Sequence, residues 1–346
     1  MVSIETQDLT RSYETYKKAE GLWKSIEGLW ARETLQKTAL HPTTLRIESG
    51  QIVGLVGSNG AGKTTLLKLL SGLIHPTSGS AKVLGYEPAA RKPDFLKRIS
   101  ILLGQKNQLW WDLPAADSYD LLGKIYELDR TKAKKRVADL ADMLGCTSQL
   151  HVQLRRLSLG ERMKMEIIGA LLHEPEVLFL DEPTIGLDII SQTTIREFLA
   201  SYVKERHPTV ILTSHYMDDI SLLADRLLLI SQGQIVFDGA VEIFMARAES
   251  RQTLSFKFMQ PPEKDLEVAP GFMITAGTRA VTKELPATEI GEVLKNVMHV
   301  SPIQEIKIEE VEFEDVIRQF MQQDAQLRAP RGPACGRASS RPTGRS

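Results

Sequence analysis

The sequence is poor in cysteine and has no long hydrophobic run. Two cysteines among 346 residues, Cys146 and Cys335, cannot form a disulfide framework, and they favour a reducing compartment. The N-terminal residues lack the apolar core of a signal peptide. Apolar runs such as IIGALL and RLLLI are far shorter than the roughly 18 residues that a membrane helix needs. We therefore expect a protein that does not itself span a membrane.

Acidic residues are absent from the end of the chain, although the formal net charge of the whole sequence is only −1. After Asp324 the sequence contains arginine, proline, glycine and serine but neither aspartate nor glutamate. This composition predicts a disordered basic tail at 326–346. A solvated appendage is favoured there over a contact with anionic lipid or RNA. With 42% hydrophobic and 25% charged residues, the rest is typical of a globular protein.

A glycine-rich loop lies between a predicted strand and a predicted helix. The strand is the apolar run 51–56, the loop is GSNGAGKTT at 57–65, and an apolar stripe at 66–73 follows. The loop matches G-x-x-x-x-G-K-[ST] in the context that a phosphate-binding P-loop requires. Lys63 would reach the terminal phosphates and Thr64 would offer its hydroxyl to Mg²⁺. We therefore expect a nucleoside triphosphate bound by Gly57, Ser58, Asn59, Gly60, Ala61, Gly62, Lys63, Thr64 and Thr65.

A second strand supplies two carboxylates. The continuous apolar run 177–180 is typical of a parallel strand buried on both faces, and Asp181 and Glu182 follow it directly. Ligands of open α/β sheets bind at the carboxyl ends of the strands, where the P-loop also opens. We expect Asp181 to hold Mg²⁺ and Glu182 to orient or deprotonate the attacking water.

Two further predicted strands end in polar residues at the same edge of the sheet. The run at 100–104 precedes Gln105, and TVILTS at 209–214 precedes His215. A single glutamine or histidine after a strand is usually a solvated loop residue. Because four strand ends converge on one site here, we assign both residues to catalysis.

The segment LSLGE at 157–161 allows two interpretations. Ser158 followed by Glu161 fits a capping box, in which the two side chains bond to backbone N–H groups at a helix start. The same helix N-terminus favours anions, so it could also bind a phosphate.

The order of these elements resembles that of the ATP-binding cassette (ABC) ATPases. Tyr13, the P-loop, Gln105, LSLGE, the strand that ends in Asp181 and Glu182, the GLD turn at 186–188 and His215 follow one another as in that family. The resemblance covers most of residues 1–245. It implies a P-loop α/β core with a helical subdomain at about 106–165, and an ATPase that needs ATP and Mg²⁺.

The resemblance also implies a pair of ATPase subunits with each ATP between the P-loop of one and the signature of the other. The chain would form a homodimer or pair with a related ATPase subunit. LSLGE resembles the family's LSGGQ signature, so Ser158 and Gly160 would face the partner's ATP, and Asp188 would also contribute to the nucleotide site. Gln105 would be a metal ligand as well. Tyr13 resembles the residue that stacks on adenine, although a surface aromatic is the alternative.

Leu159 and Glu161 depart from that signature. Leu159 replaces a glycine and removes the conformations with positive φ that glycine allows. Glu161 replaces a glutamine and adds negative charge near a triphosphate, unless it folds back as the capping-box acceptor. We expect a competent site whose affinity for ATP and turnover depend on these two residues.

Two segments that contain tryptophan are not needed for ATP binding or hydrolysis. Leu22, Ile26, Leu29 and Trp30, together with Trp23, predict one helical face, which would either pack on its own domain or dock on a membrane partner. In the resembled family, the region after Gln105 receives short helices of the membrane subunit. Trp110 and Trp111 lie there, either presented to that partner or buried as a pair around a turn.

The chain is expected to contain three regions. Residues 1–248 would form the ABC ATP-binding domain, residues 249–325 a small α+β accessory domain, and residues 326–346 the basic tail. In the accessory domain, TLSFKF and IQEIKI predict strands, Thr288 is expected to cap an amphipathic helix, and Val316, Ile317 and Phe320 predict a final helix.

We identify the chain by this resemblance as the ATPase subunit of an ABC transporter on the cytoplasmic side of the cell membrane, held there by separate transmembrane permease subunits. The GLIHPTSG, LGY and QKNQLWWDLP segments resemble exporter ATPases of the drug-resistance (daunorubicin-like) branch, so export is favoured over import. A soluble ABC ATPase acting on DNA or ribosomes is the alternative from another class. It would need long coiled coils, zinc-binding cysteines or two cassettes, and we expect no nucleic-acid partner. A regulatory module without turnover is disfavoured by Glu182 and His215.

Replacing Lys63 with alanine should abolish tight ATP binding. The triphosphate would lose its main positive partner in a desolvated loop. Isothermal calorimetry of the variant and the parent protein measures this directly, and an unchanged affinity would refute the P-loop assignment.

Overall fold

The computed structural model describes residues 1–16, 34–104, 107–214, 216–249, 251–269, 272–299 and 302–310. Several predictions lie outside these residues. They are the aromatic helix at 22–30, Gln105, His215, the final helix around Val316 and the basic tail.

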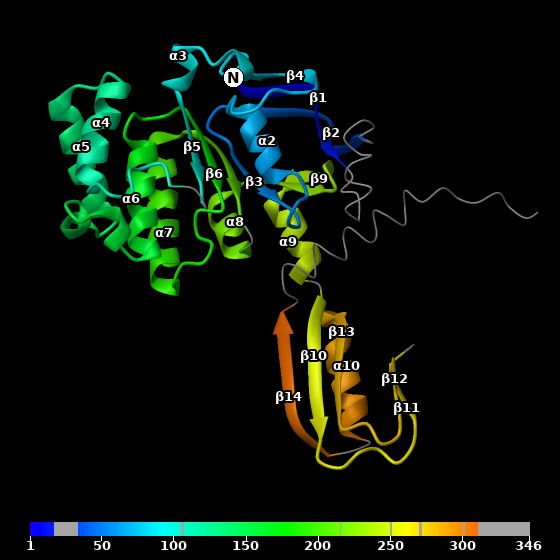
Figure 1. The fold of residues 1–346 in the computed structure, drawn as a ribbon. Coiled ribbons are helices and arrows are strands. Elements are labelled where there is room, and N and C mark those ends of the chain that lie inside the picture. Colours follow the sequence, from blue (N-terminus) through cyan, green and yellow to red (C-terminus); the bar gives the residue numbers. More distant parts are fainter. Residues whose placement is uncertain are drawn as a thin grey trace, which may run out of the picture.

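A six-stranded sheet forms the centre of the larger part of the molecule (Figure 1). Its strands are parallel except for the last pair, in which β9 runs antiparallel to β8. The α/β fold with a mainly parallel sheet, predicted from the sequence, is confirmed. In spatial order the strands are β5 (Ile99–Leu103), β6 (Val177–Asp181), β7 (Thr209–Thr213), β3 (Ile52–Val56), β8 (Arg226–Ser231) and β9 (Gln234–Ala240).

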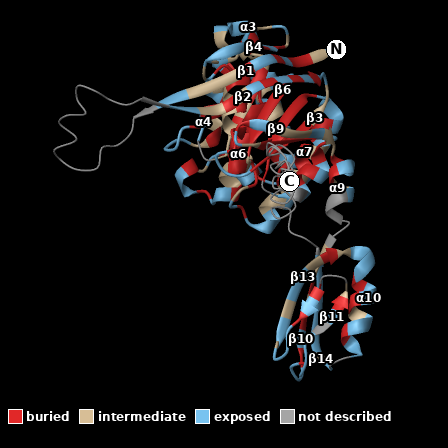
Figure 2. Ribbon diagram, turned by 90° about the vertical axis from the view of Figure 1, so that its right-hand side faces the viewer, coloured by how far each residue is buried: buried red, intermediate tan, exposed pale blue. Residues whose placement is uncertain are grey.

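The strands β6 and β7 are buried along their whole length, as their continuous apolar sequences predict. Successive side chains of β6 point to opposite faces of the sheet, so Phe179 packs in one core and Leu178 and Leu180 pack in the other. Figure 2 shows the buried residues concentrated along this central sheet. The sheet is therefore the fixed layer that carries the site at its carboxyl edge.

One face of the central sheet packs against α2 (Lys63–Leu70) and a smaller antiparallel sheet. The smaller sheet has the order β2 (Thr34–Glu48), β1 (Val2–Tyr16), β4 (Ser78–Val83). Ile4, Leu40 and Leu66 are fully buried in this core. Two short helical segments follow β4, η1 (Pro88–Ala90) and α3 (Pro93–Leu96).

The other face of the sheet is covered by helices (Figure 1). The helix α6 runs past the boundary expected near residue 165, and its apolar C-terminal half packs in the core of the sheet. The part of the chain between β5 and β6 contains α4 (Ala115–Ile125), α5 (Arg130–Met143), η2 (Thr147–Gln149), η3 (Leu154–Arg156) and α6 (Leu159–Leu171). After β6 come α7 (Ile189–Arg206), α8 (Met217–Leu223) and α9 (Val241–Glu249).

A small unit follows α9 and lies apart from the central sheet in Figure 1. Leu254, Phe256 and Val293 lie in its own apolar core, which joins α10 to one face of a three-stranded sheet. The sheet has the order β13 (Ala280–Pro286), β10 (Arg251–Phe258), β14 (Ile303–Glu310), and β11 (Leu266–Ala269) pairs with β12 (Phe272–Ile274). The strands expected at TLSFKF and IQEIKI correspond to β10 and β14.

The start of the helix in this unit differs from the prediction. We expected Thr288 to be its N-cap, but α10 (Ala287–Met298) begins before that residue, and Pro286 occupies the cap without a side-chain hydrogen bond. The reason is that β13 extends to Pro286, which restricts the backbone and lets the helix follow at once. The cap assignment of Thr288 was therefore wrong.

Within the described parts of the chain, no helix has both the length and the apolar character needed to span a bilayer.

Candidate functional site

The loop between β3 and α2 follows a path that only glycine permits at two positions. A Cβ atom on Gly57 would lie 2.2 Å from the carbonyl oxygen of Ile230. Gly62, at the start of α2, has a φ of +113°. The motif glycines are thus required by the neighbouring chain and by the backbone, and the loop leaves its N–H groups unobstructed by side chains at these points.

Lys63 is the most enclosed charge of the loop. Its side chain is 4% exposed, and its ammonium nitrogen Nζ donates to the carbonyl oxygens of Gly57 at 2.6 Å and Ser58 at 3.3 Å. Burial lowers the pKa of Lys63, while the nearby carboxylates of Glu182 and Asp181 oppose that effect. An anion placed in the loop would restore the stability of the charged form, so the geometry fits a phosphate.

Asp181 lies at the end of β6 between two threonine hydroxyls. Thr64 Oγ1 donates to one carboxylate oxygen and Thr213 Oγ1 to the other, each at 2.8 Å. The hydroxyl and carboxylate predicted for Mg²⁺ are therefore already in contact. Hard oxygen ligands of this kind, completed by phosphate and water, suit Mg²⁺.

Glu182 adopts a backbone conformation that side chains rarely tolerate, with a φ of +55°. Its N–H group donates to Thr213 Oγ1 at 2.9 Å, and one carboxylate oxygen lies 3.9 Å from Lys63 Nζ. The left-handed turn ends β6 and brings this carboxylate next to the P-loop lysine. The chain holds Glu182 in this strained conformation through the neighbouring strand β7.

A buried hydrogen-bond network that the sequence analysis missed supports the ends of β6 and β7. Its centre is Asp219 of α8, which is 1% exposed. The hydroxyls of Thr184 and Ser214 donate to one of its carboxylate oxygens, and the guanidinium of Arg196 pairs with the other. The sequence did not predict this role of Asp219, because an acidic residue in the first turn of a helix is common.

The LSLGE segment forms the predicted capping box. Glu161 N donates to Ser158 Oγ at 3.3 Å, and Ser158 N donates to Glu161 Oε2 at 2.9 Å. The pKa of Glu161 is lowered by hydrogen bonds that its carboxylate accepts, first from the Ser158 N–H group, then from the Gln149 side-chain amide and the Ser158 hydroxyl. The interpretation as a cap is confirmed, while the contact with a partner's phosphate stays a prediction.

Gly160 packs against the start of the next long helix of the same chain. A Cβ atom on Gly160 would lie 2.1 Å from Ser191 Oγ and 3.3 Å from Asp188 Oδ2. Asp188 caps α7 by accepting from Ser191 N at 2.9 Å and from Ser191 Oγ at 2.7 Å. Asp188 therefore lies beside the signature of its own chain.

Tyr13 lies on β1 and is 36% exposed, with the Arg11 guanidinium 4.5 Å from its ring centroid. Both interpretations of Tyr13 remain compatible with this position. Trp110 and Trp111 are 41% and 42% exposed, so the alternative of a buried pair is wrong. Leu113 beside them is also exposed, which makes this an apolar surface.

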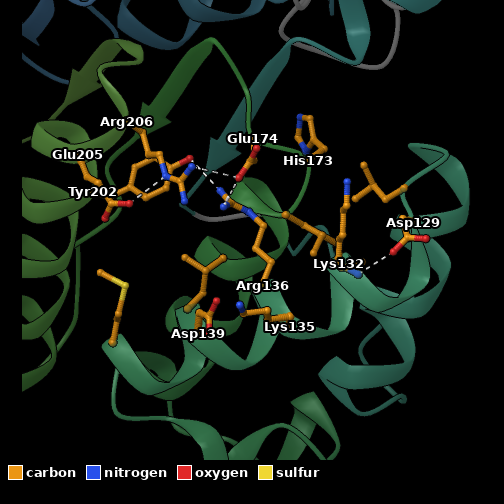
Figure 3. A pocket seen from close by; sticks show the side chains of 15 residues that line it. Asp129, Lys132, Lys135, Arg136, Asp139, His173, Glu174, Tyr202, Glu205 and Arg206 are labelled. Atoms are coloured by element: carbon orange, nitrogen blue, oxygen red, sulfur yellow. Dashed lines mark hydrogen bonds and ion pairs between the residues drawn. The ribbon is translucent and has the colours of Figure 1, made fainter.

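A cavity of about 510 Å³ lies elsewhere, between α5 and α7 (Figure 3). Arg136 crosses it and contacts the Glu174 carboxylate, the Leu171 carbonyl oxygen at 3.0 Å and the Tyr202 hydroxyl at 3.2 Å. None of the P-loop residues lines this cavity. Its charged residues connect the helical part to the sheet core, and we do not assign it to the phosphate site.

Comparisons with known proteins agree with this geometry. The family described as "ABC transporter" matches residues 40–185. The chain is similar to the ABC transporter ATP-binding protein NatA of Bacillus subtilis, with 33% identity over 221 residues that cover 64% of this chain and 89% of NatA. The doxorubicin resistance ATP-binding protein DrrA of Mycobacterium tuberculosis is 35% identical over 61% of this chain and 63% of DrrA. The bacitracin transport ATP-binding protein BcrA of Bacillus licheniformis is 31% identical over 67% of this chain and 68% of BcrA.

A solved structure shares the fold. The chain resembles the ATP-binding cassette MJ0796 in a dimeric post-hydrolysis state bound to ADP and Pi, with a TM-score of 0.58 and 21% identity. The match covers 69% of this chain and 98% of that one.

Replacing Thr213 with valine should weaken the site with little change in shape. The substitution removes the donor to Asp181 and one of two acceptors for the Glu182 N–H group, which keeps the Thr213 carbonyl oxygen at 3.1 Å. The loss of a buried hydrogen-bond partner costs about 1–3 kcal/mol. Because Thr213 orients the carboxylate that is predicted to bind Mg²⁺, we expect ATPase activity or Mg²⁺ affinity to fall about 10- to 100-fold. A Mg²⁺ titration of ATPase activity provides the measurement.

Thr209→Val is the matched control, since Thr209 is also buried on β7 and its hydroxyl accepts from Gly50 N at 3.1 Å. Both variants should lose stability in urea unfolding, but only Thr213→Val should change the Mg²⁺ dependence. An equal change in both variants would contradict the special position of Thr213.

Proposed function

The chain belongs to the ABC transporter ATP-binding proteins, the subunits that hydrolyse ATP for ABC transporters, and from that membership we propose that it powers the export of a small molecule through separate permease subunits. The observation that carries the proposal is the cluster of Lys63, Thr64, Asp181 and Glu182, joined by contacts between the start of α2 and the end of β6. Relatives named for doxorubicin resistance and bacitracin transport support export. The chain spans 89% of NatA but about two thirds of several other relatives.

We propose the following roles for the residues of the cluster. The loop glycines and Lys63 bind the phosphates, because the glycines place no side chain over the loop backbone and the ammonium of Lys63 is buried. The Thr64 hydroxyl and the Asp181 carboxylate hold Mg²⁺, which neutralises charge on the phosphates when bound. Glu182 orients the attacking water or accepts its proton. The sequence assigns Gln105 and His215 to catalysis as well, and both lie outside the described residues.

A paired arrangement is the second element of the proposal, with Ser158 and Gly160 facing the nucleotide of a second ATPase subunit. Leu159 is 43% exposed, and Ile189 and Ile190, which follow Asp188, are 80% and 79% exposed. Apolar residues that lie this open beside a polar helix start support an interface there. The dimeric arrangement of the similar cassette agrees with such a pair.

The permease subunits would dock on the exposed surface at Trp110, Trp111 and Leu113. Aromatic side chains of this kind are common anchors of protein interfaces. Leu121 and Ile125 on α4 are also exposed and add apolar surface to the same helical part of the chain. The attachment to permeases would hold the subunit at the cytoplasmic side of the membrane.

Mixing two inactive variants tests whether one ATP site is shared between two chains. The first is Lys63→Ala. The second is Ser158→Asp, which keeps a good N-cap residue but places negative charge where the partner's phosphate would lie. Asp is preferred to any substitution of Gly160, since a side chain there would collide with Ser191. In a mixed dimer, one site combines the intact Lys63 with the intact signature.

Random pairing of equal amounts makes about half of the dimers mixed, so about a quarter of all sites are whole. We expect single-turnover ATP cleavage to recover on mixing and to be absent from either variant alone. Ser148→Asp, which adds the same charge at an exposed position, is the control and should cleave like the parent. No recovery, with chain exchange shown independently, would contradict the shared site.

Replacing Trp110 and Trp111 together with alanine should weaken attachment to the permeases. The two side chains are exposed, so their loss should leave the fold and ATP affinity intact while co-purification with membrane subunits falls. Quantitative mass spectrometry of detergent extracts measures the co-purified subunits. Undiminished co-purification would move the docking site away from this surface.

A further inference from the structure

The two tryptophans belong to a turn whose backbone is bound by a buried carboxylate. We call residues 107–113 the Trp turn. At its start, Gln108 N donates to Glu166 Oε2 at 3.0 Å and to Oε1 at 3.2 Å, and Leu109 N donates to Oε1 at 3.3 Å. Glu166 lies on α6, about two helical turns after Ser158. A single side chain therefore links the Trp turn to the helix that begins at the signature.

The end of the Trp turn is bound to the residues just before the signature. Arg155 N donates to the Trp111 carbonyl oxygen at 3.1 Å, and Leu154 N donates to that of Leu113 at 3.2 Å. The Arg155 side chain also forms an exposed ion pair with Asp112 at 3.2 Å. The signature thus lies between two attachment points of the same turn.

The helix also contacts one indole directly. The guanidinium carbon of Arg162, one turn after Ser158, lies 4.6 Å from the centroid of the Trp111 ring. The Gln108 side chain connects the Trp turn to the central sheet, since its amide donates to the Ile101 carbonyl oxygen of β5. The backbone hydrogen bonds of the Trp turn to other elements, its ion pair and its cation–π contact described above therefore lead to residues 154–166.

Burying the Glu166 carboxylate costs free energy, because a charged group loses its hydration there. Its side chain is 4% exposed, and burial raises its pKa, although the N–H groups of Gln108 and Leu109 and the charge of Arg162 oppose this rise. An apolar side chain of similar length would fill the same space without desolvating a charge. What the carboxylate provides instead is an acceptor for two backbone N–H groups, which fixes the direction of the Trp turn.

We propose that Glu166 is a positioning residue that makes the Trp turn and the signature helix one rigid body. A displacement of Ser158 toward a partner's ATP would then carry Trp110 and Trp111 with it, so the nucleotide state would reach the docking surface through this carboxylate. The inference rests on the proposed function, which supplies the shared ATP site and the docking role of the tryptophans.

Hydrogen exchange of the full-length protein tests the local part of this proposal. Without nucleotide, Glu166→Ala should speed the exchange of the Gln108 and Leu109 amides by about tenfold or more, since hydrogen bonds to a carboxylate are stronger than neutral ones. Glu166→Gln should fall between the alanine variant and the parent, because it keeps one acceptor oxygen but turns an N–H donor toward the turn.

Tyr119→Phe is the matched control. Tyr119 is buried, and its hydroxyl donates to the Met165 carbonyl oxygen of α6 at 2.9 Å, so the substitution removes a buried hydrogen bond to α6 but leaves the Glu166 carboxylate in place. It should lower stability in urea unfolding but leave the exchange of residues 107–113 as in the parent. Equal acceleration of that peptide in Tyr119→Phe and Glu166→Ala would reduce Glu166 to a structural role and overturn the proposal.

The coupling is tested with ATP in a Glu182→Gln background, which slows hydrolysis. In this background ATP should change the exchange of both the signature peptide around Ser158 and the Trp-turn peptide. Adding Glu166→Ala should preserve the change at the signature and abolish it at the Trp turn. An unchanged response of the Trp turn, or no response of the Trp turn before Glu166 is altered, would overturn the proposal.

Calorimetric ATP binding on the same samples separates this proposal from the proposed function. Loss of ATP binding in the Glu182→Gln background would count against the ATP site itself. Normal ATP binding with an uncoupled Trp turn in the presence of Glu166 would count only against the positioning role.

Discussion

The burial of one ammonium group constrains much of the architecture around the site. Lys63 lies at the start of α2 with its charge enclosed, and it is held by carbonyl oxygens of its own loop and by nearby carboxylates. Such a charge is stable only if opposite charge and hydrogen-bond acceptors are fixed around it. The buried strands β6 and β7 provide that fixed environment, because they position Asp181 and Glu182 from a layer packed on both faces.

The strained turn at Glu182 shows how this environment is maintained. A positive φ at a glutamate is unfavourable by itself, so neighbouring groups must select it. The hydroxyl of Thr213 accepts a hydrogen bond from the N–H group of Glu182. Asp219 accepts hydrogen bonds from Thr184, which follows β6, and from Ser214, which follows β7. The carboxyl ends of β6 and β7 are thus held by a buried network centred on Asp219, which is not among the residues predicted to bind phosphate or Mg²⁺.

The sequence predicted the parts of the site in which chemistry demands fixed spacing. The P-loop, the strand before Asp181 and the LSLGE cap could be read because their residues are adjacent in the chain. Asp219 and Glu166 could not, since their partners lie on other elements and an acidic residue on a helix is usually solvated. In the small unit, β10 and β14 alternate clearly, whereas Thr288 misled because β13 continues to Pro286 and the helix starts earlier. The positions of Gln105 and His215 lie outside the described residues.

The capping box within the signature has a kinetic consequence. The hydroxyl of Ser158 also donates to Glu161 Oε2 at 2.9 Å. A hydroxyl carries one proton, so it cannot donate to this carboxylate and to a phosphate oxygen at the same time. Closing two subunits on ATP would therefore exchange one hydrogen bond for another instead of adding one. With the proposed shared site, the smaller net gain would shorten the lifetime of the closed pair, and Glu161 would compete with ATP for the Ser158 hydroxyl.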